Sequence, residues 1–141
     1  MFDYKILMNS KKTFRRNVDE LQHIFDFLKM NFQKVPIQQK DQFEMELSVE
    51  EIFMNMIRHN SSSAKEIEVC VKGDEHTVTL SLTDYEKTPF DITKTKEIDF
   101  QAYFREKKSG GLGIHLVKQF MDSVTFNHQN GVSTITITKH I

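Results

Sequence analysis

The segment 46–60, ELSVEEIFMNMIRHN, places an acid, an amide and an imidazole four residues apart. In a helix, Glu51, Asn55 and His59 therefore form one file. This file borders an apolar stripe that contains Met45, Val49, Ile52, Phe53 and Met56. Asn55 offers a neutral carbonyl oxygen that suits Mg²⁺, and Glu51 could take a proton from a hydroxyl or water. The alternative interpretation is that both are ordinary residues at the boundary of a core.

Asp84 is a second candidate because it ends an alternating segment, HTVTLSLTD at 76–84. It shares strand parity with the apolar residues Val78, Leu80 and Leu82. A carboxylate that faces a core is costly unless it is paired or hydrogen-bonded. Asp84 could accept a hydrogen bond from an amine such as the exocyclic amine of a purine. Alternatively, the strand ends at Thr83 and Asp84 begins the turn.

The third candidate is SGGLGIHLVKQF at 109–120, which holds three of the five glycines of the chain. Gly110, Gly111 and Gly113 surround Leu112 at the entrance of an amphipathic helical pattern. Glycines at a helix N-terminus let backbone N–H groups approach an anion closely, so a phosphate could bind here. A flexible hinge or close packing between loop and helix would explain the glycines equally well.

Composition limits the class of protein. The 141 residues, 38% hydrophobic and 28% charged, predict one globular domain spanning 1–141. A net charge of −1 with scattered Lys and Arg argues against direct nucleic-acid binding. No apolar run approaches the ~20 residues that span a bilayer. A single cysteine, Cys70, and no visible signal peptide favour the cytoplasm. The sequence has no zinc-binding spacing and no P-loop.

The predicted elements alternate between helices and strands. Residues 3–8 read as a first strand, and 85–109 as a long loop that could act as a lid. An apolar stripe with helical spacing follows the first strand and contains Phe14, Val18, Leu21, Phe25, Leu28 and Phe32. Further helices are expected at 38–60 and 111–122, and further strands at 65–72, 76–84, 123–128 and 132–139. Turns are expected at Gly73-Asp74 and Asn130-Gly131. This order predicts an α/β chain with a largely antiparallel sheet and helices on one face.

The order of the three candidate motifs resembles that of the GHKL ATPase superfamily, and most closely its anti-sigma-factor serine kinases from bacterial partner-switching systems. The segments that carry the resemblance are VEEIFMNMIRHN, LSLTDYEKTPFD and GGLGIHLVKQFMDSVTF. The similarity spans about residues 10–140. It implies a histidine-kinase-like ATPase domain with a Bergerat-type fold, an α+β two-layer sandwich whose mixed sheet is mostly antiparallel.

The resemblance also implies ATP and Mg²⁺ as cofactors and gives roles to the candidates. Glu51 would be the catalytic base, Asn55 the Mg²⁺ ligand and Asp84 the acceptor for the adenine amine. A hydroxyl in the last strand would reach adenine through water, and Ser133 has the same parity as Ile135 and Ile137. The implied nucleotide-binding set is Asn55, His59, Asp84, Gly110, Gly111, Leu112, Gly113 and Ser133.

The function implied is a serine/threonine-protein kinase that phosphorylates a STAS-type anti-sigma antagonist, with a sigma factor as a further partner. A homodimer through the first strand is a possibility by analogy. The sequence departs from the family where D-x-G is expected, since it reads Asp84-Tyr85-Glu86. Glu86 brings a negative side chain where glycine lets backbone approach the base. The alternative is therefore a non-catalytic or weakly nucleotide-dependent module that binds a sigma factor or another regulator.

Overall fold

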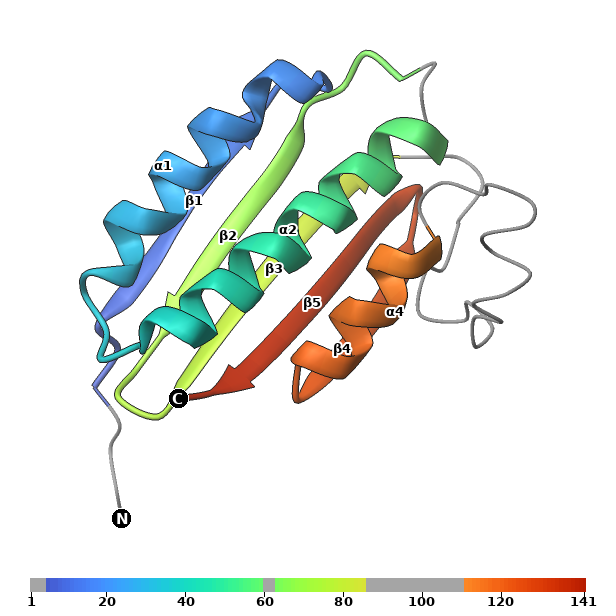
Figure 1. Ribbon diagram of the computed structural model, residues 1–141. Coiled ribbons are helices and arrows are strands. Elements are labelled where there is room, and N and C mark those ends of the chain that lie inside the picture. Colours follow the sequence, from blue (N-terminus) through green and yellow to red (C-terminus); the bar gives the residue numbers. More distant parts are fainter. Residues whose placement is uncertain (1–4, 60–62, 86–110) are drawn as a thin grey trace.

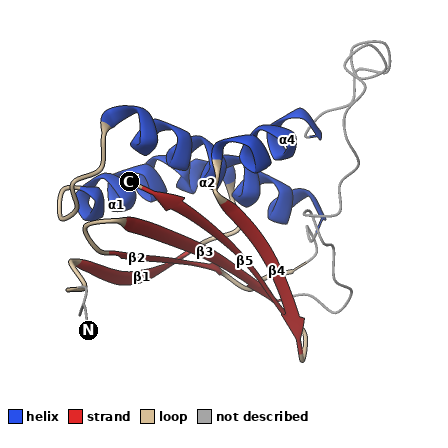
Figure 2. Ribbon diagram, turned by 90° about the horizontal axis from the view of Figure 1, so that it is seen from below, coloured by secondary structure: helices blue, strands red, loops and turns tan. Residues whose placement is uncertain are grey.

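The computed structural model describes residues 5–59, 63–85 and 111–141. The described residues form a two-layer α+β sandwich, with the helices packed on one face of a five-stranded sheet (Figure 2). In chain order the elements are β1 (Met8–Phe14), a 3-10 turn η1 (Val18–Glu20), α1 (Leu21–Phe32), α2 (Gln39–His59), β2 (Ile67–Gly73), β3 (Thr77–Tyr85), α4 (Gly111–Phe120), β4 (Ser123–Gln129) and β5 (Val132–His140).

The sheet has the strand order β1-β2-β3-β5-β4. Each of these four pairings is antiparallel. The predicted fold class is therefore confirmed: a mostly antiparallel sheet is covered by helices on one face (Figure 2). β1 and β4 are the edge strands, and Figure 1 shows α1, α2 and α4 running roughly along the strands.

Strict alternation in β3 and β5 separates the two faces of the sheet. The side chains that face the helices are buried and include Val78, Leu80, Leu82, Ile135 and Ile137. The opposite face carries threonines, and the hydroxyls of Thr83 and Thr134 lie 3.2 Å apart across the two strands. This period-2 pattern made these strands predictable, because one face is apolar and the other is polar.

The core-facing stripe of α2 is the predicted one. Its buried apolar residues are Met45, Val49, Ile52, Phe53 and Met56. In α1, by contrast, the buried apolar residues are Ile24, Phe27, Leu28 and Phe32. Leu21 and Phe25, which the predicted stripe included, are only partly buried. The predicted stripe was out of phase because it started at Phe14, which belongs to β1, whereas the α-helix starts at Leu21.

The prediction of a first strand at 3–8 was wrong in position, since β1 runs from Met8 to Phe14. Met8 and Phe14 are buried at the two ends of this strand, but none of the five residues between them is buried. The segment therefore lacks the alternation that marks a strand. Its strand conformation depends instead on hydrogen-bonded pairing with β2. Asn130 and Gly131 both have positive φ, 54° and 77°, as the predicted tight turn requires. The predicted loop at 85–109 lies outside the described residues, apart from Tyr85 at the end of β3.

Candidate functional site

The candidate residues come from elements that converge at one end of the sandwich. The C-terminal end of α2, the end of β3, the start of β5 and the start of α4 all lie at the right-hand end in Figure 1. Asp84 and Ser133 are direct register partners on β3 and β5. The helices α2 and α4 pack against each other above these strands. Segments that are far apart in the sequence thus bring together the elements that carry the described candidate residues.

Glu51 and Asn55 are joined within α2. The amide nitrogen Nδ2 of Asn55 donates to the backbone oxygen of Glu51 at 2.8 Å and to its Oε1 at 3.0 Å. Nη2 of Arg58 lies 3.4 Å from the same Oε1. Asn55 is buried, whereas His59 is exposed at the last position of the helix. Because the nitrogen of the amide is engaged with Glu51, its oxygen is the atom that could bind a ligand.

Asp84 is buried within β3, with 1% of its surface exposed, so it does not begin a turn. Its Oδ1 accepts a hydrogen bond from the backbone nitrogen of Tyr85 at 2.8 Å. Its carboxylate also forms a buried ion pair with Arg16: Nη2 donates to Oδ1, and Nη1 lies 3.4 Å from Oδ2. Nη1 of Arg16 donates in addition to the backbone oxygen of Met56 at 3.1 Å.

Arg16 was not identified from the sequence. It lies in the connection between β1 and η1, beside Arg15, whose side chain is 70% exposed. A pair of adjacent arginines usually reads as a solvated surface. No local spacing shows that one of them pairs with a carboxylate 68 positions away.

Ser133 is buried, with 2% of its surface exposed, and it lies beside Asp84 in the register of β3 and β5. Its Oγ is 2.7 Å from Nδ1 of His128, its register partner on β4. The parity that selected Ser133 from the sequence is therefore correct. His128 was not predicted, although pairing across the Asn130-Gly131 turn would have placed it opposite Ser133.

The glycine-rich candidate falls at the N-terminus of α4. The helix begins at Gly111, so that Gly111, Leu112 and Gly113 form its first turn. Gly110 lies outside the described residues. The N–H groups of a first helical turn have no acceptor within the helix, and the helix dipole favours an anion there. This end of α4 could therefore bind a phosphate group.

The described residues contain no cluster of three or more His, Cys, Asp or Glu side chains that could hold a metal ion. Asn55 would supply a single protein oxygen. This set fits Mg²⁺ of the kind that is bound mainly by substrate phosphates and water, with few protein ligands. It does not fit a metal centre built from protein side chains alone.

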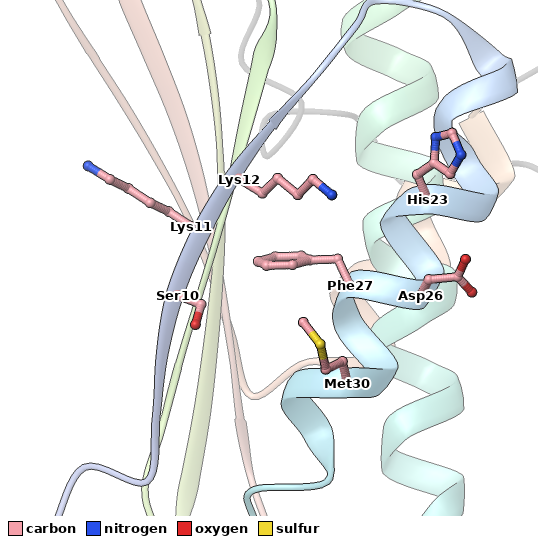
Figure 3. Close-up of a pocket in the computed structure, with 7 residues that line it drawn as sticks. All are labelled: Ser10, Lys11, Lys12, His23, Asp26, Phe27 and Met30. Carbon is pink, nitrogen blue, oxygen red and sulfur yellow. The ribbon is translucent and has the colours of Figure 1, made fainter.

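A separate cavity of about 450 Å³ lies between the edge strand β1 and α1 (Figure 3). Its lining residues are Ser10, Lys11, Lys12, His23, Asp26, Phe27 and Met30. In Figure 3, Phe27 extends from α1 toward the strand, and Lys12 extends from the strand toward the helix. None of the predicted site residues lines this cavity.

In the described parts of the chain, no helix has the length and apolar character needed to cross a membrane.

Residues 14–139 match the family model of the histidine kinase-like ATPase domain. The match covers most of the chain, so the protein belongs to this family. The resemblance to the GHKL ATPases that was seen in the three motifs is thereby confirmed. No curated protein gives a significant match.

Two solved structures share the fold. The RsbU and RsbW domains of Rv1364c from Mycobacterium tuberculosis match with a TM-score of 0.66 and 13% identity, over 93% of this chain. The protein described here spans only 32% of that longer chain. The SiaB–SiaC complex from Pseudomonas aeruginosa matches with a TM-score of 0.57 and 14% identity, covering 98% of this chain and 92% of that one. At these identities the similarity establishes the shared fold.

Proposed function

We propose that the protein is an ATP-dependent serine/threonine-protein kinase that phosphorylates a STAS-type or SiaC-type protein. The observation that carries the proposal is that the C-terminal half of α2, which holds Glu51 and Asn55, converges with the adjacent Asp84 and Ser133 and with the N-terminus of α4 toward one end of the sandwich (Figure 1). These elements combine an acid, an amide oxygen, a buried carboxylate and a helix N-terminus. Such groups suit the binding of a nucleoside triphosphate and the transfer of its phosphate.

The proposed roles follow from the chemistry of each group. Asp84 accepts a hydrogen bond from the adenine amine, and Ser133 lies beside it for a contact through water. The first turn of α4, with Gly110 preceding it, binds the phosphates through backbone N–H groups. His59, at the exposed end of α2, lines the outer part of the site.

Glu51 is the proposed base, which takes the proton from the attacking hydroxyl of the protein substrate. Its carboxylate is partly exposed, so a hydroxyl from a docked protein can approach it. Asn55, one helical turn further on, would hold Mg²⁺, which neutralises phosphate charge when it is bound. Phosphoryl transfer depends mainly on positioning and charge neutralisation, and two residues on one rigid helix face suit that task.

The proposed partners are small regulatory proteins. The similar SiaB structure was solved in complex with SiaC, and the RsbW domain shares a chain with an RsbU domain. We extend this pattern to a STAS-type antagonist, and to a sigma factor bound by the same chain. β1 is an edge strand, so it could pair with a second copy in a homodimer. We expect a cytoplasmic location.

The direct test is to incubate the purified protein with ATP, Mg²⁺ and its cognate STAS-type protein, and to measure phosphate on the partner by intact mass. The proposal predicts one phosphate per partner at a serine or threonine, dependent on Mg²⁺. If the partner gains no phosphate while the two proteins form a complex, the kinase proposal is refuted and a binding role remains.

A second candidate function is a binding module that uses nucleotide weakly or not at all. The Arg16–Asp84 ion pair favours it, because the carboxylate proposed for adenine already has a cationic partner. The presence of Glu86 in place of the usual glycine points the same way. Calorimetry separates the two functions: a binding module forms its protein complex with unchanged affinity at millimolar ATP, whereas the kinase binds ATP.

A further inference from the structure

Arg16 connects three elements at the proposed binding site of the nucleotide base. Its guanidinium donates to Asp84 at the end of β3 and to the backbone oxygen of Met56 in α2, while its own backbone connects β1 to η1. The side chain of Arg16 is only 6% exposed. Met56 is close to the C-terminus of α2, where backbone oxygens are short of partners and the helix dipole attracts a cation.

This contact occupies the group that the nucleotide base needs. With its side chain 1% exposed, Asp84 offers almost no open surface to a ligand. Its carboxylate accepts from both Nη atoms of Arg16 and from the backbone of Tyr85. Because Asp84 is almost fully buried, an amine of the nucleotide base can reach its carboxylate only if a neighbouring group moves. Of the donors that now contact the carboxylate, Arg16 is the one on a side chain that can rotate away.

The ion pair is also incompletely satisfied. Among the buried side-chain nitrogen and oxygen atoms in the described residues, Nε of Arg16 is the one without a hydrogen-bond partner. A buried donor with no acceptor carries a desolvation cost. The desolvation cost of this unpaired Nε therefore offsets part of the free energy of the ion pair between Arg16 and Asp84. If Arg16 rotated away from Asp84, its Nε would be hydrated again.

We propose that Arg16 competes with the nucleotide base for Asp84 and thereby sets the affinity of the site. This inference rests on the proposed nucleotide-binding function. Arg16 is a determinant of ligand affinity and not a catalytic residue. The nucleotide base binds only after Arg16 has left the carboxylate of Asp84; a molecule in that state is called open. The measured dissociation constant therefore equals the dissociation constant of the open molecules divided by the fraction of molecules that are open.

Calorimetric titration with Mg²⁺–ATP tests this competition in three proteins: wild type, Arg16→Met and Arg15→Met. Methionine removes the donors while keeping an unbranched apolar chain. Arg15 is the matched control because it is the adjacent arginine but is mostly exposed. We expect Arg16→Met to bind ATP at least about tenfold more tightly than wild type, as it would if fewer than about a tenth of wild-type molecules are open. Arg15→Met should bind ATP with the same affinity as wild type.

The other outcomes separate the two proposals. Equal ATP affinity in wild type and folded Arg16→Met overturns the competition and leaves the nucleotide-binding function intact. A lack of ATP binding at millimolar concentration in both folded proteins overturns the competition and the nucleotide-binding function together. A gain shared by Arg15→Met would show an effect of net charge, and this also overturns the specific role of Arg16.

A second measurement uses only the wild-type protein, since Arg16→Met leaves a buried carboxylate unpaired and could unfold. Phenylglyoxal modifies accessible arginines, and tandem mass spectrometry distinguishes Arg16 from Arg15. Without nucleotide, Arg15 should react and Arg16 should be protected. Saturating Mg²⁺–ATP should increase modification of Arg16 at least severalfold relative to Arg15. Unchanged or reduced reactivity of Arg16 would overturn the proposal.

Discussion

The amide nitrogen of Asn55 lies 3.0 Å from Oε1 of Glu51, one turn away on the same helix. A second bond, to the backbone oxygen of Glu51 at 2.8 Å, fixes the plane of the amide. The proposed base and the proposed Mg²⁺ ligand are thus oriented by each other before any ligand binds. Such preorganisation is what phosphoryl transfer gains from a rigid scaffold.

We predict that Glu51→Gln lowers the rate of phosphate transfer to the partner about 100-fold or more, because general-base catalysis contributes roughly that much. Glutamine retains an oxygen that can accept from Asn55, so ATP affinity should change less than about twofold. The measurement is the single-turnover rate with saturating partner. Glu50→Gln, which removes the neighbouring charge, is the control and should behave as wild type. Equal rates in all three proteins would show that Glu51 is not the base.

We predict that Asn55→Ala removes the dependence of ATP affinity on Mg²⁺. In wild type, Mg²⁺ should tighten ATP binding because the amide oxygen of Asn55 would hold the ion, which would neutralise phosphate charge. In the variant, affinities with Mg²⁺ and with a chelator should converge to within about twofold. Calorimetry in both conditions measures this. A variant that keeps the full effect of Mg²⁺ would place the ion on another group.

Strict periodicity made most of the fold predictable from the sequence. The strands β3 and β5 alternate without interruption, and α2 repeats its apolar residues at helical spacing, so their predicted ends lie within two residues of the observed ones. The same parity correctly placed Asp84 and Ser133 on the inner face of the sheet. The positions of these candidate residues in the fold were predictable because each extends or borders an apolar pattern.

What the sequence did not show depends on contacts across long separations. β1 carries buried residues only at its ends, Met8 and Phe14, so its pairing with β2 determines it. Arg16 meets Asp84 only after β1 and β3 join the same sheet. Strand parity marked Asp84 as a core-facing carboxylate that needs a partner, but no helical or strand period identifies Arg16 as that partner.

Asp74 supplies a prediction about pH. Its Oδ1 accepts hydrogen bonds from the backbone nitrogens of His76 and Thr77, at 2.7 and 2.8 Å. The bond from His76 foremost, and then the bond from Thr77, lower the pKa of the Asp74 carboxyl below its usual value. A lowered folded-state pKa stabilises the protein above the unfolded-state pKa of about 3.9, and the gain is lost as pH falls through the folded-state pKa.

We therefore expect Asp74→Asn to unfold more easily than wild type at pH 7, by less than about 1 kcal/mol because solvent screens this turn. The difference should shrink as pH falls below about 4, where the carboxyl of the unfolded chain becomes protonated, and it should be lost as pH falls through the lower folded-state pKa. Urea unfolding over a series of pH values gives the comparison. Glu75→Gln removes a charge from the adjacent exposed residue and serves as the control. A difference that stays constant down to acid pH would contradict the assignment.

Lys139 ties β5 to two helices at the end of the sheet away from Asp84. Its Nζ lies 2.6 Å from Oε2 of Glu44 in α2 and 2.6 Å from the backbone oxygen of Phe120, the last residue of α4. The side chains of Lys139 and Glu44 are only 10% and 12% exposed. Breaking one member of such a pair leaves a buried charge without its partner.

We predict that Lys139→Met lowers the free energy of unfolding by about 3 kcal/mol, which corresponds to a fall in Tm of about 10 °C for a chain of this size. Lys40→Met is the matched control, because Lys40 lies 3.9 Å from the other oxygen of Glu44 and is 84% exposed. It should change stability by less than about 0.5 kcal/mol. The double variant Lys139→Met with Glu44→Leu should recover much of the loss, since it removes both buried charges. The measurement is thermal unfolding of wild type, the two single variants and the double variant. A Lys139→Met protein as stable as Lys40→Met would show that the ion pair contributes little to stability.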